Sequence, residues 1–115
     1  MQTIFHVDEL EKWGLALGNA ENMLAYCEES GEAVKIELLA NGIAVRALAA
    51  EGSDAALLQR MAALAEKDVV FAACRNALRA QQIEPEALAP FAVTVPAGVV
   101  ELAQKQQAGY AYIRP

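Results

Sequence analysis

The sequence predicts a three-layer α/β/α single domain around a mostly parallel sheet of about five strands. Segments with strand composition alternate with helical patterns along the chain, an order typical of parallel strands joined by right-handed helical crossovers. Residues 69–73 (VVFAA) are apolar on both faces, as expected for a central parallel strand. The chain has 115 residues, which is enough for one hydrophobic core and too few for two ordinary domains.

The first part of the chain predicts a strand, a helix and a second strand. Residues 3–7 (TIFHV) form a short β-rich strand, followed by a polar loop over residues 8–13. Apolar side chains then recur at helical spacing over residues 15–29, and Ser30-Gly31 ends this helix. Residues 34–40 (VKIELLA) are the second strand.

The middle of the chain predicts two helical segments and the third strand. Residues 43–50 form a short helical run directly after the second strand. Ser53 or Asp54 can cap a longer helix over residues 55–67. The apolar third strand, residues 69–73, follows this helix.

The last part of the chain repeats the alternation. It contains a short helix, the fourth strand, a longer helix and the final strand, in residues 76–81, 92–95, 99–107 and 110–113. Because strands and helices alternate to the end, all five strands are expected in one sheet.

Composition narrows the class of protein. Apolar residues make up 56% of the chain and mean hydropathy is +0.21, which is high for a small domain with little interior. We therefore expect other copies of the chain to cover part of the surface, in a homo-oligomer. No apolar run approaches the roughly 20 residues of a membrane span, and the N-terminus lacks a signal-peptide pattern, so a cytoplasmic location is expected.

The charges argue against a nucleic-acid partner. The net charge is −6 and the pI is about 4.7, and the nine Lys and Arg residues are scattered along the chain. A protein that binds phosphates regardless of sequence needs a basic face. We expect no nucleic acid and no membrane among the partners.

The two cysteines are expected to be free thiols. Cys27 and Cys74 form no CxxC pair, and a single histidine leaves no zinc-ligand pattern. We therefore expect no metal and no cofactor. Cys27 lies on an apolar helix stripe, where a free cysteine packs as a small hydrophobic residue.

The carboxyl ends of the strands are the expected functional edge, because ligands of parallel α/β sheets bind there. The segments that leave the predicted strands at this edge are residues 8–13, Asn41-Gly42, residues 74–76 and residues 96–98. Asn41-Gly42 precedes a helical run, so we interpret it as a strand-to-helix turn.

Cys74 is the candidate reactive group at this edge. It lies between a strand end and a helix start, where a helix N-terminus favours a thiolate. Arg75 is adjacent and can assist. Backbone N–H groups around Asn76, Asn41-Gly42 and Pro96-Ala97-Gly98 would shape the pocket. The alternative is that Cys74 only ends a buried strand.

Two further residues are candidates with open roles. His6, the only histidine, lies near the carboxyl end of the first strand and would be the base in a Cys–His pair; the alternative is a histidine that is hydrogen-bonded within the fold. Trp13 would line either the pocket or an interface.

Several segments together resemble the DsrE-like proteins, a group of small α/β proteins that includes the DsrE/DsrF and YchN types. They are TIFHVDE, LALGNAENML, VKIELLANGIAV, VVFAACRNALRAQQI and VTVPAGVVELAQKQQAGYAYIRP, and they run almost from end to end. The resemblance implies a homotrimer or a hexamer of two trimers, and a cysteine that carries persulfide sulfur between proteins. Cys74 occupies the matching position.

The resemblance leads to a first hypothesis and two alternatives. The first is a sulfur carrier, or sulfurtransferase-like protein, with Cys74 as persulfide acceptor and with donor and acceptor proteins as partners. The second is a non-catalytic, oligomeric module that binds a small ligand, with Cys74 only lining the pocket. The third is a redox-sensing thiol.

Overall fold

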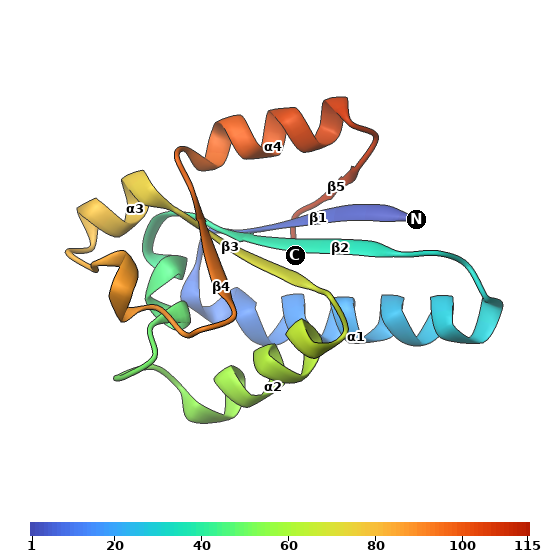
Figure 1. The fold of residues 1–115 in the computed structure, drawn as a ribbon, viewed down its shortest axis with the longest axis horizontal. Coiled ribbons are helices and arrows are strands. Elements are labelled where there is room, and N and C mark those ends of the chain that lie inside the picture. Colours follow the sequence, from blue (N-terminus) through green and yellow to red (C-terminus); the bar gives the residue numbers. More distant parts are fainter.

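Five parallel strands form one sheet in the computed structural model of the protein, which describes residues 1–115 (Figure 1). The strands are β1 (Gln2–Val7), β2 (Lys35–Ala40), β3 (Val70–Cys74), β4 (Ala92–Val95) and β5 (Ala111–Ile113). Their order across the sheet is β4-β3-β2-β1-β5, and every pairing is parallel. The predicted fold class is therefore confirmed.

Helices cover the two faces of the sheet unequally. The helices are α1 (Trp13–Ser30), α2 (Ala55–Glu66), α3 (Arg75–Ala80) and α4 (Gly98–Gln107), with 3-10 turns η1 (Leu10–Lys12), η2 (Gly42–Leu48) and η3 (Pro85–Ala87). Helices α1 and α2 lie on one face, and α4 lies by itself on the other (Figure 1). None of the helices combines the length and apolar character that crossing a membrane requires.

The face under α1 and α2 holds the main core. A cluster of 23 buried residues packs there. Trp13 and Phe71 are both fully buried, with ring centroids 6.3 Å apart. The Trp13 indole N–H donates to the carbonyl of Ala44 at 3.0 Å, so the one polar atom of this large side chain is satisfied. Most of the apolar burial that stabilises the domain comes from this face.

The face under α4 holds a much smaller cluster. Its buried members are Ile4, Leu39, Ala72 and Leu102. Within α4 only Gly98 and Leu102 are buried, so one large side chain carries the apolar contact of this helix with the sheet.

Several element boundaries differ from the predictions by one or two residues, and two of these differences concern Trp13 and Cys74. The predicted loop over residues 8–13 contains η1, and α1 begins at Trp13 rather than at residue 15. The 3-10 turn leads directly into the α-helix, and it turns the large apolar Trp13 side chain into the core. Strand β3 extends through Cys74, which pairs with Val95; the cysteine is the last residue of the strand.

Local sequence signals explain the ends of the two long helices. Asp54, rather than Ser53, caps α2: its Oδ1 accepts from the N–H groups of Ala56 and Leu57 at 2.9 and 3.1 Å. Such a cap contributes about 1 kcal/mol. Gly31 ends α1 with a φ of 75°, a left-handed conformation that favours glycine.

Candidate functional site

Three segments that leave the carboxyl ends of strands meet at Cys74. The Gly98 N–H donates to Cys74 Sγ at 3.2 Å. A methyl group added at Gly98 would lie 3.1 Å from Asn41 Nδ2 and 3.3 Å from Cys74 Cβ. The structure thus brings together Asn41 after β2, Cys74 at the end of β3 and Gly98 after β4.

Gly98 has no room for a side chain at this meeting point. Contacts of 3.1 to 3.3 Å are tighter than ordinary van der Waals contact, and the atoms involved belong to both neighbours of the site. The close approach of backbone to sulfur therefore depends on glycine at this position.

The Cys74 thiol lies at the start of two helices. Cys74 is the N-cap residue of α3, and its sulfur accepts from Gly98, the first residue of α4. Unpaired N–H groups at a helix N-terminus give it a partial positive charge that favours an anion. The arrangement suits a sulfur atom that gains negative charge.

Access to the thiol is restricted. Cys74 is only 3% exposed. Cys74 packs within the main cluster of buried residues, and the start of α4 lies against its sulfur. Reaction at Cys74 therefore requires a local opening around the sulfur.

Asn41 and Gly42 form the turn beside the thiol. Asn41 Oδ1 accepts from the Gly42 N–H at 3.0 Å, which leaves Asn41 Nδ2 on the side of Gly98. Gly42 has a φ of 53° and approaches the carbonyl of Asp8. Because Asn41 is the N-cap residue of η2 and accepts this bond, its amide is held in place next to the site.

Of the remaining predicted pocket residues, Pro96 and Ala97 contribute backbone, and the side chain of Asn76 points away from the site. Ala97 is the extended N-cap residue of α4 and follows Pro96, so these two residues set the start of the helix. The Asn76 side chain is paired with Arg79 of its own helix. Its amide faces the surface of α3.

Arg75 does not contact the thiol. Its Nε donates to Thr94 Oγ1 at 3.0 Å. Thr94 precedes Val95, the partner of Cys74 in the sheet, and successive strand residues point to opposite faces. Arg75 is therefore held on the face away from α4, which corrects the expectation that its charge assists the thiolate.

His6 forms a separate pair with Tyr112. Its Nδ1 lies 2.8 Å from Tyr112 Oη. Its Nε2 is buried without a partner. Burial lowers the pKa of His6; Asp8 opposes this shift and Arg114 adds to it. Strand β2 separates β1 from β3, so His6 is bonded within the fold and is not the base of a Cys–His pair.

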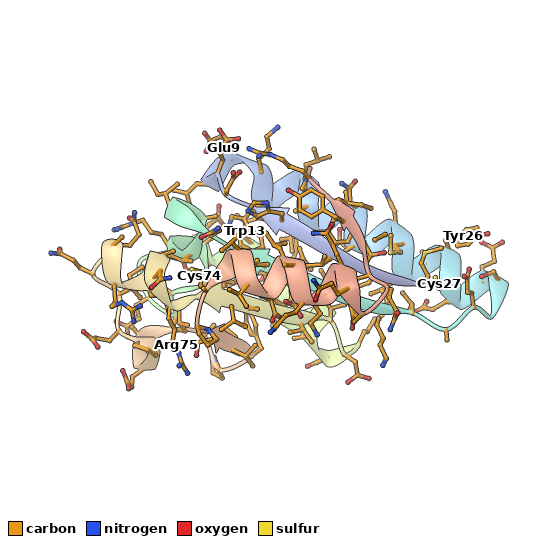
Figure 2. All side chains as sticks on the ribbon, turned by 90° about the horizontal axis from the view of Figure 1, so that it is seen from above. Glu9, Trp13, Tyr26, Cys27, Cys74 and Arg75 are labelled. Atoms are coloured by element: carbon orange, nitrogen blue, oxygen red, sulfur yellow. The ribbon has the colours of Figure 1, made fainter.

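Trp13 and Cys27 belong to the interior. Trp13 is fully buried with its N–H satisfied, so it has no surface to offer a ligand or a partner; this corrects its assignment to the pocket or interface. Cys27 is 2% exposed in α1. Figure 2 places Cys27 and Cys74 far apart along the molecule, and both are free thiols.

Sequence reasoning missed the most unusual residue on the α4 face, Glu37. It is 3% exposed in the middle of β2. Its Oε1 lies 3.5 Å from Lys105 Nζ, and its Oε2 is buried without a partner. Burial, and then Glu101, raise the pKa of Glu37 to about 8 despite Lys105. The signal was a single acidic residue inside the otherwise apolar run IELLA.

Fold and site together define a class of protein: a parallel α/β domain with a lone cysteine at the carboxyl edge of its sheet, at the start of a helix. The DsrE/DsrF-like family matches residues 4–115. The chain belongs to this family, which is associated with sulfur relay in general.

Two solved structures share the fold over their whole length. One is the protein of unknown function MTH1491 from Methanobacterium thermoautotrophicum, with a TM-score of 0.87 and 30% identity over 99% of this chain and 98% of that chain. The other is the ychN protein from E. coli, with a TM-score of 0.68 and 20% identity over 100% of both chains. The second likeness concerns the fold alone. A search of curated proteins found no match.

Proposed function

We propose that this protein is a sulfur carrier in which Cys74 accepts and delivers sulfane sulfur. The Cys74 thiolate attacks the outer sulfur of a donor such as thiosulfate, the S–S bond breaks, and sulfite leaves with the electron pair. The cysteine persulfide then gives its outer sulfur to an acceptor nucleophile, which restores the thiolate. Neither step needs an external oxidant or reductant, and no metal or organic cofactor is required.

The hydrogen bond from Gly98 to Cys74 Sγ carries this proposal. The first N–H of α4 points at the sulfur from 3.2 Å, and a helix N-terminus stabilises negative charge within its first turn. Both the attacking thiolate and the persulfide are anions. The same helix end would therefore stabilise the carrier before and after loading, in agreement with the association of the family with sulfur relay.

The enclosure of Cys74 favours a second candidate, a module that binds a small ligand. At 3% exposure the thiol can line a pocket without reacting. The polar lining would then come from Asn41 Nδ2 and the backbone N–H groups near Gly98. In that case a Cys74→Ser variant would keep its ligand, whereas a sulfur carrier would lose its function.

We expect the carrier to act as a homo-oligomer, a trimer or a hexamer. Large apolar side chains are exposed on α4 and on strand positions that face it: Val70 is 41% exposed, Val93 49%, Val99 70% and Val100 49%. Exposed apolar patches of this kind mark protein interfaces. Light scattering of the purified protein would give the mass; a monomer at every concentration would contradict this expectation.

We expect the physiological donor and acceptor to be proteins of a reducing compartment, with thiosulfate as the donor used in the test. Cys27 and Cys74 are free, and free thiols persist in the cytoplasm. We therefore place the sulfur carrier in the cytoplasm.

Persulfide loading tests the proposal. The protein would be incubated with thiosulfate or polysulfide, and intact mass compared for wild type, Cys74→Ser and Cys27→Ser. We expect a gain of about 32 Da per sulfur in wild type and Cys27→Ser and none in Cys74→Ser. Equal loading of the two single variants, or none in wild type, would favour the binding module.

A further inference from the structure

Helix α4 has a thin apolar attachment to the sheet. Leu102 is its one large buried side chain, and it packs against a cluster with only three other buried members. Val99 and Val100 point to the surface at 70% and 49% exposure. Yet the first N–H of this helix holds Cys74 Sγ. Another contact must therefore help to hold α4 in position.

The polar contact between Glu37 and Lys105 is that second attachment. Glu37 Oε1 lies 3.5 Å from Lys105 Nζ. Lys105 also stands over the ring of Tyr110, with Nζ 5.0 Å from the centroid, a favourable cation–π contact. The contact joins the middle of β2 to the second half of α4, whereas Asn41 and Cys74 meet the helix at its start.

We propose that Glu37 and Lys105 are positioning residues for Cys74: they fix α4 on the sheet, and their contact keeps the Gly98 N–H on the thiol sulfur. The consequence of this inference for sulfur transfer rests on the role proposed for Cys74. The positioning of α4 by Glu37 and Lys105 does not depend on that role. When α4 loosens from the sheet, its start lifts, the hydrogen bond breaks and the sulfur becomes accessible.

The charges around Glu37 make this attachment sensitive to pH. Glu101 and Lys105 face Glu37 from α4, with Tyr110 beyond Lys105. The neighbours of Glu37 in register, Ile4 on β1 and Val70 on β3, carry no charge. Burial and the nearby Glu101 raise the pKa of Glu37 to about 8.

The direction of the pH effect follows from this shift. Below pH 8 the neutral carboxyl of Glu37 tolerates both burial and Glu101. Ionisation adds a buried negative charge against Glu101, which Lys105 offsets only in part. Like charges at short range repel strongly where water is excluded. The protein therefore holds α4 progressively more loosely as the pH rises towards about 8.

Two measurements test this inference without any sulfur donor. The first is hydrogen exchange of the Gly98 amide by NMR, corrected for the intrinsic pH dependence. The second is the rate at which iodoacetamide, a neutral electrophile, alkylates Cys74, resolved from Cys27 by peptide mass spectrometry. Wild type would be compared with Glu37→Gln, a neutral isostere, and with Glu29→Gln, a change at an exposed glutamate of α1.

From about pH 6.5 to about pH 9.5, the alkylation rate of wild type relative to Glu37→Gln should rise about three- to tenfold, and Gly98 exchange should rise in wild type only. Taking the ratio removes thiolate formation, which both proteins share. Glu29→Gln should follow wild type. Parallel wild-type and Glu37→Gln profiles would overturn the inference, and so would a Gly98 amide in wild type whose protection does not change with pH. Because neither measurement uses sulfane sulfur, a failure here differs from a failure of persulfide loading.

Discussion

The two faces of the sheet differ in how they are stabilised. The face under α1 and α2 buries 23 residues in one cluster, with Trp13 and Phe71 at its centre. The face under α4 buries a cluster of four residues and the carboxyl group of Glu37. Cys74 belongs to the larger cluster, and its sulfur accepts a hydrogen bond from α4, the helix with the smaller apolar contact.

Because of this difference, the stability of the fold and the accessibility of Cys74 depend on different parts of the molecule. A dense core resists local opening, whereas a helix with few buried contacts opens at low cost. Cys74 ends a strand of the stable core, and its sulfur contacts the first residue of the lightly attached α4. The fold can therefore stay intact while the sulfur is exposed to a donor and covered again.

Removing a large side chain from the main core should have the greatest effect on stability. Trp13→Ala should lower the free energy of unfolding by about 3–5 kcal/mol, because it leaves a cavity and removes the bond to Ala44. Urea denaturation measures this loss. Leu15→Ala, two residues along α1 and 54% exposed, is the control and should cost less than about 0.5 kcal/mol. Equal effects of the two would refute the assignment of Trp13 to the core.

Removing the one apolar anchor of α4 should cost less and act on the thiol. Leu102→Ala should destabilise the domain by about 2 kcal/mol, at the low end for Leu→Ala, because its cluster is small. Alkylation of Cys74 should become faster at every pH, since α4 lifts more often. Gln104→Ala, at an exposed position of the same helix, should change neither quantity. A Leu102→Ala protein of unchanged Cys74 reactivity would show that α4 does not control access.

The buried carboxyl of Glu37 should make the free energy of unfolding decrease as the pH rises. The pKa of Glu37 is about 8 in the folded chain against an ordinary value of 4.5, so the native state holds a proton that the unfolded state loses first. Its contribution is complete below about pH 4.5 and is lost as the pH rises towards 8.

Glu37→Gln should remove this loss. The free energy of unfolding of the variant should match that of wild type in acid and exceed it by on the order of 2 kcal/mol at alkaline pH. The difference is limited because α4 can lift without global unfolding. Urea denaturation at a series of pH values would measure it. Identical pH profiles for the two proteins would contradict a buried, protonated Glu37.

The smallest expected effect on stability comes from a substitution at the start of α4, next to Cys74. Gly98→Ala places a methyl group 3.1 Å from Asn41 Nδ2, so the Asn41 side chain, Cys74 or the start of α4 must shift by a few tenths of an ångström, at a cost of about 1 kcal/mol. The control is Gly14→Ala in α1, where nothing lies within 4 Å; it should stabilise the helix by about 0.5–1 kcal/mol. Alkylation of Cys74 should change only in Gly98→Ala, and no change there would separate Gly98 from the site.

Periodicity and strand composition predicted the architecture well. The β-rich runs and apolar stripes place every strand and helix to within about two residues of the observed bounds. The miss at Trp13 has a physical cause: a 3-10 turn and the first turn of an α-helix look alike in a short polar segment. The strand order was not predicted. The alternation of strands and helices implies right-handed crossovers, but it does not tell how many strand positions each crossover spans.

Side-chain directions at the edge of the sheet were harder to predict. The topology correctly brought Asn41, Cys74 and Gly98 to one edge. Adjacency in sequence suggested that Arg75 would face the sulfur, but alternation at the strand end turns it towards Thr94. His6 likewise found a partner, Tyr112, that lies 106 residues away. Local sequence patterns do not reveal contacts of this kind, between segments that are far apart in the chain.

Cyanolysis tests the central claim, that Cys74 both holds and delivers sulfur. Protein loaded with thiosulfate and freed of excess donor would be treated with cyanide, which takes the outer persulfide sulfur and leaves as thiocyanate. The account predicts about one thiocyanate per chain from wild type and from Cys27→Ser, and none from Cys74→Ser. Thiocyanate released equally by Cys74→Ser, or none from wild type, would contradict the claim.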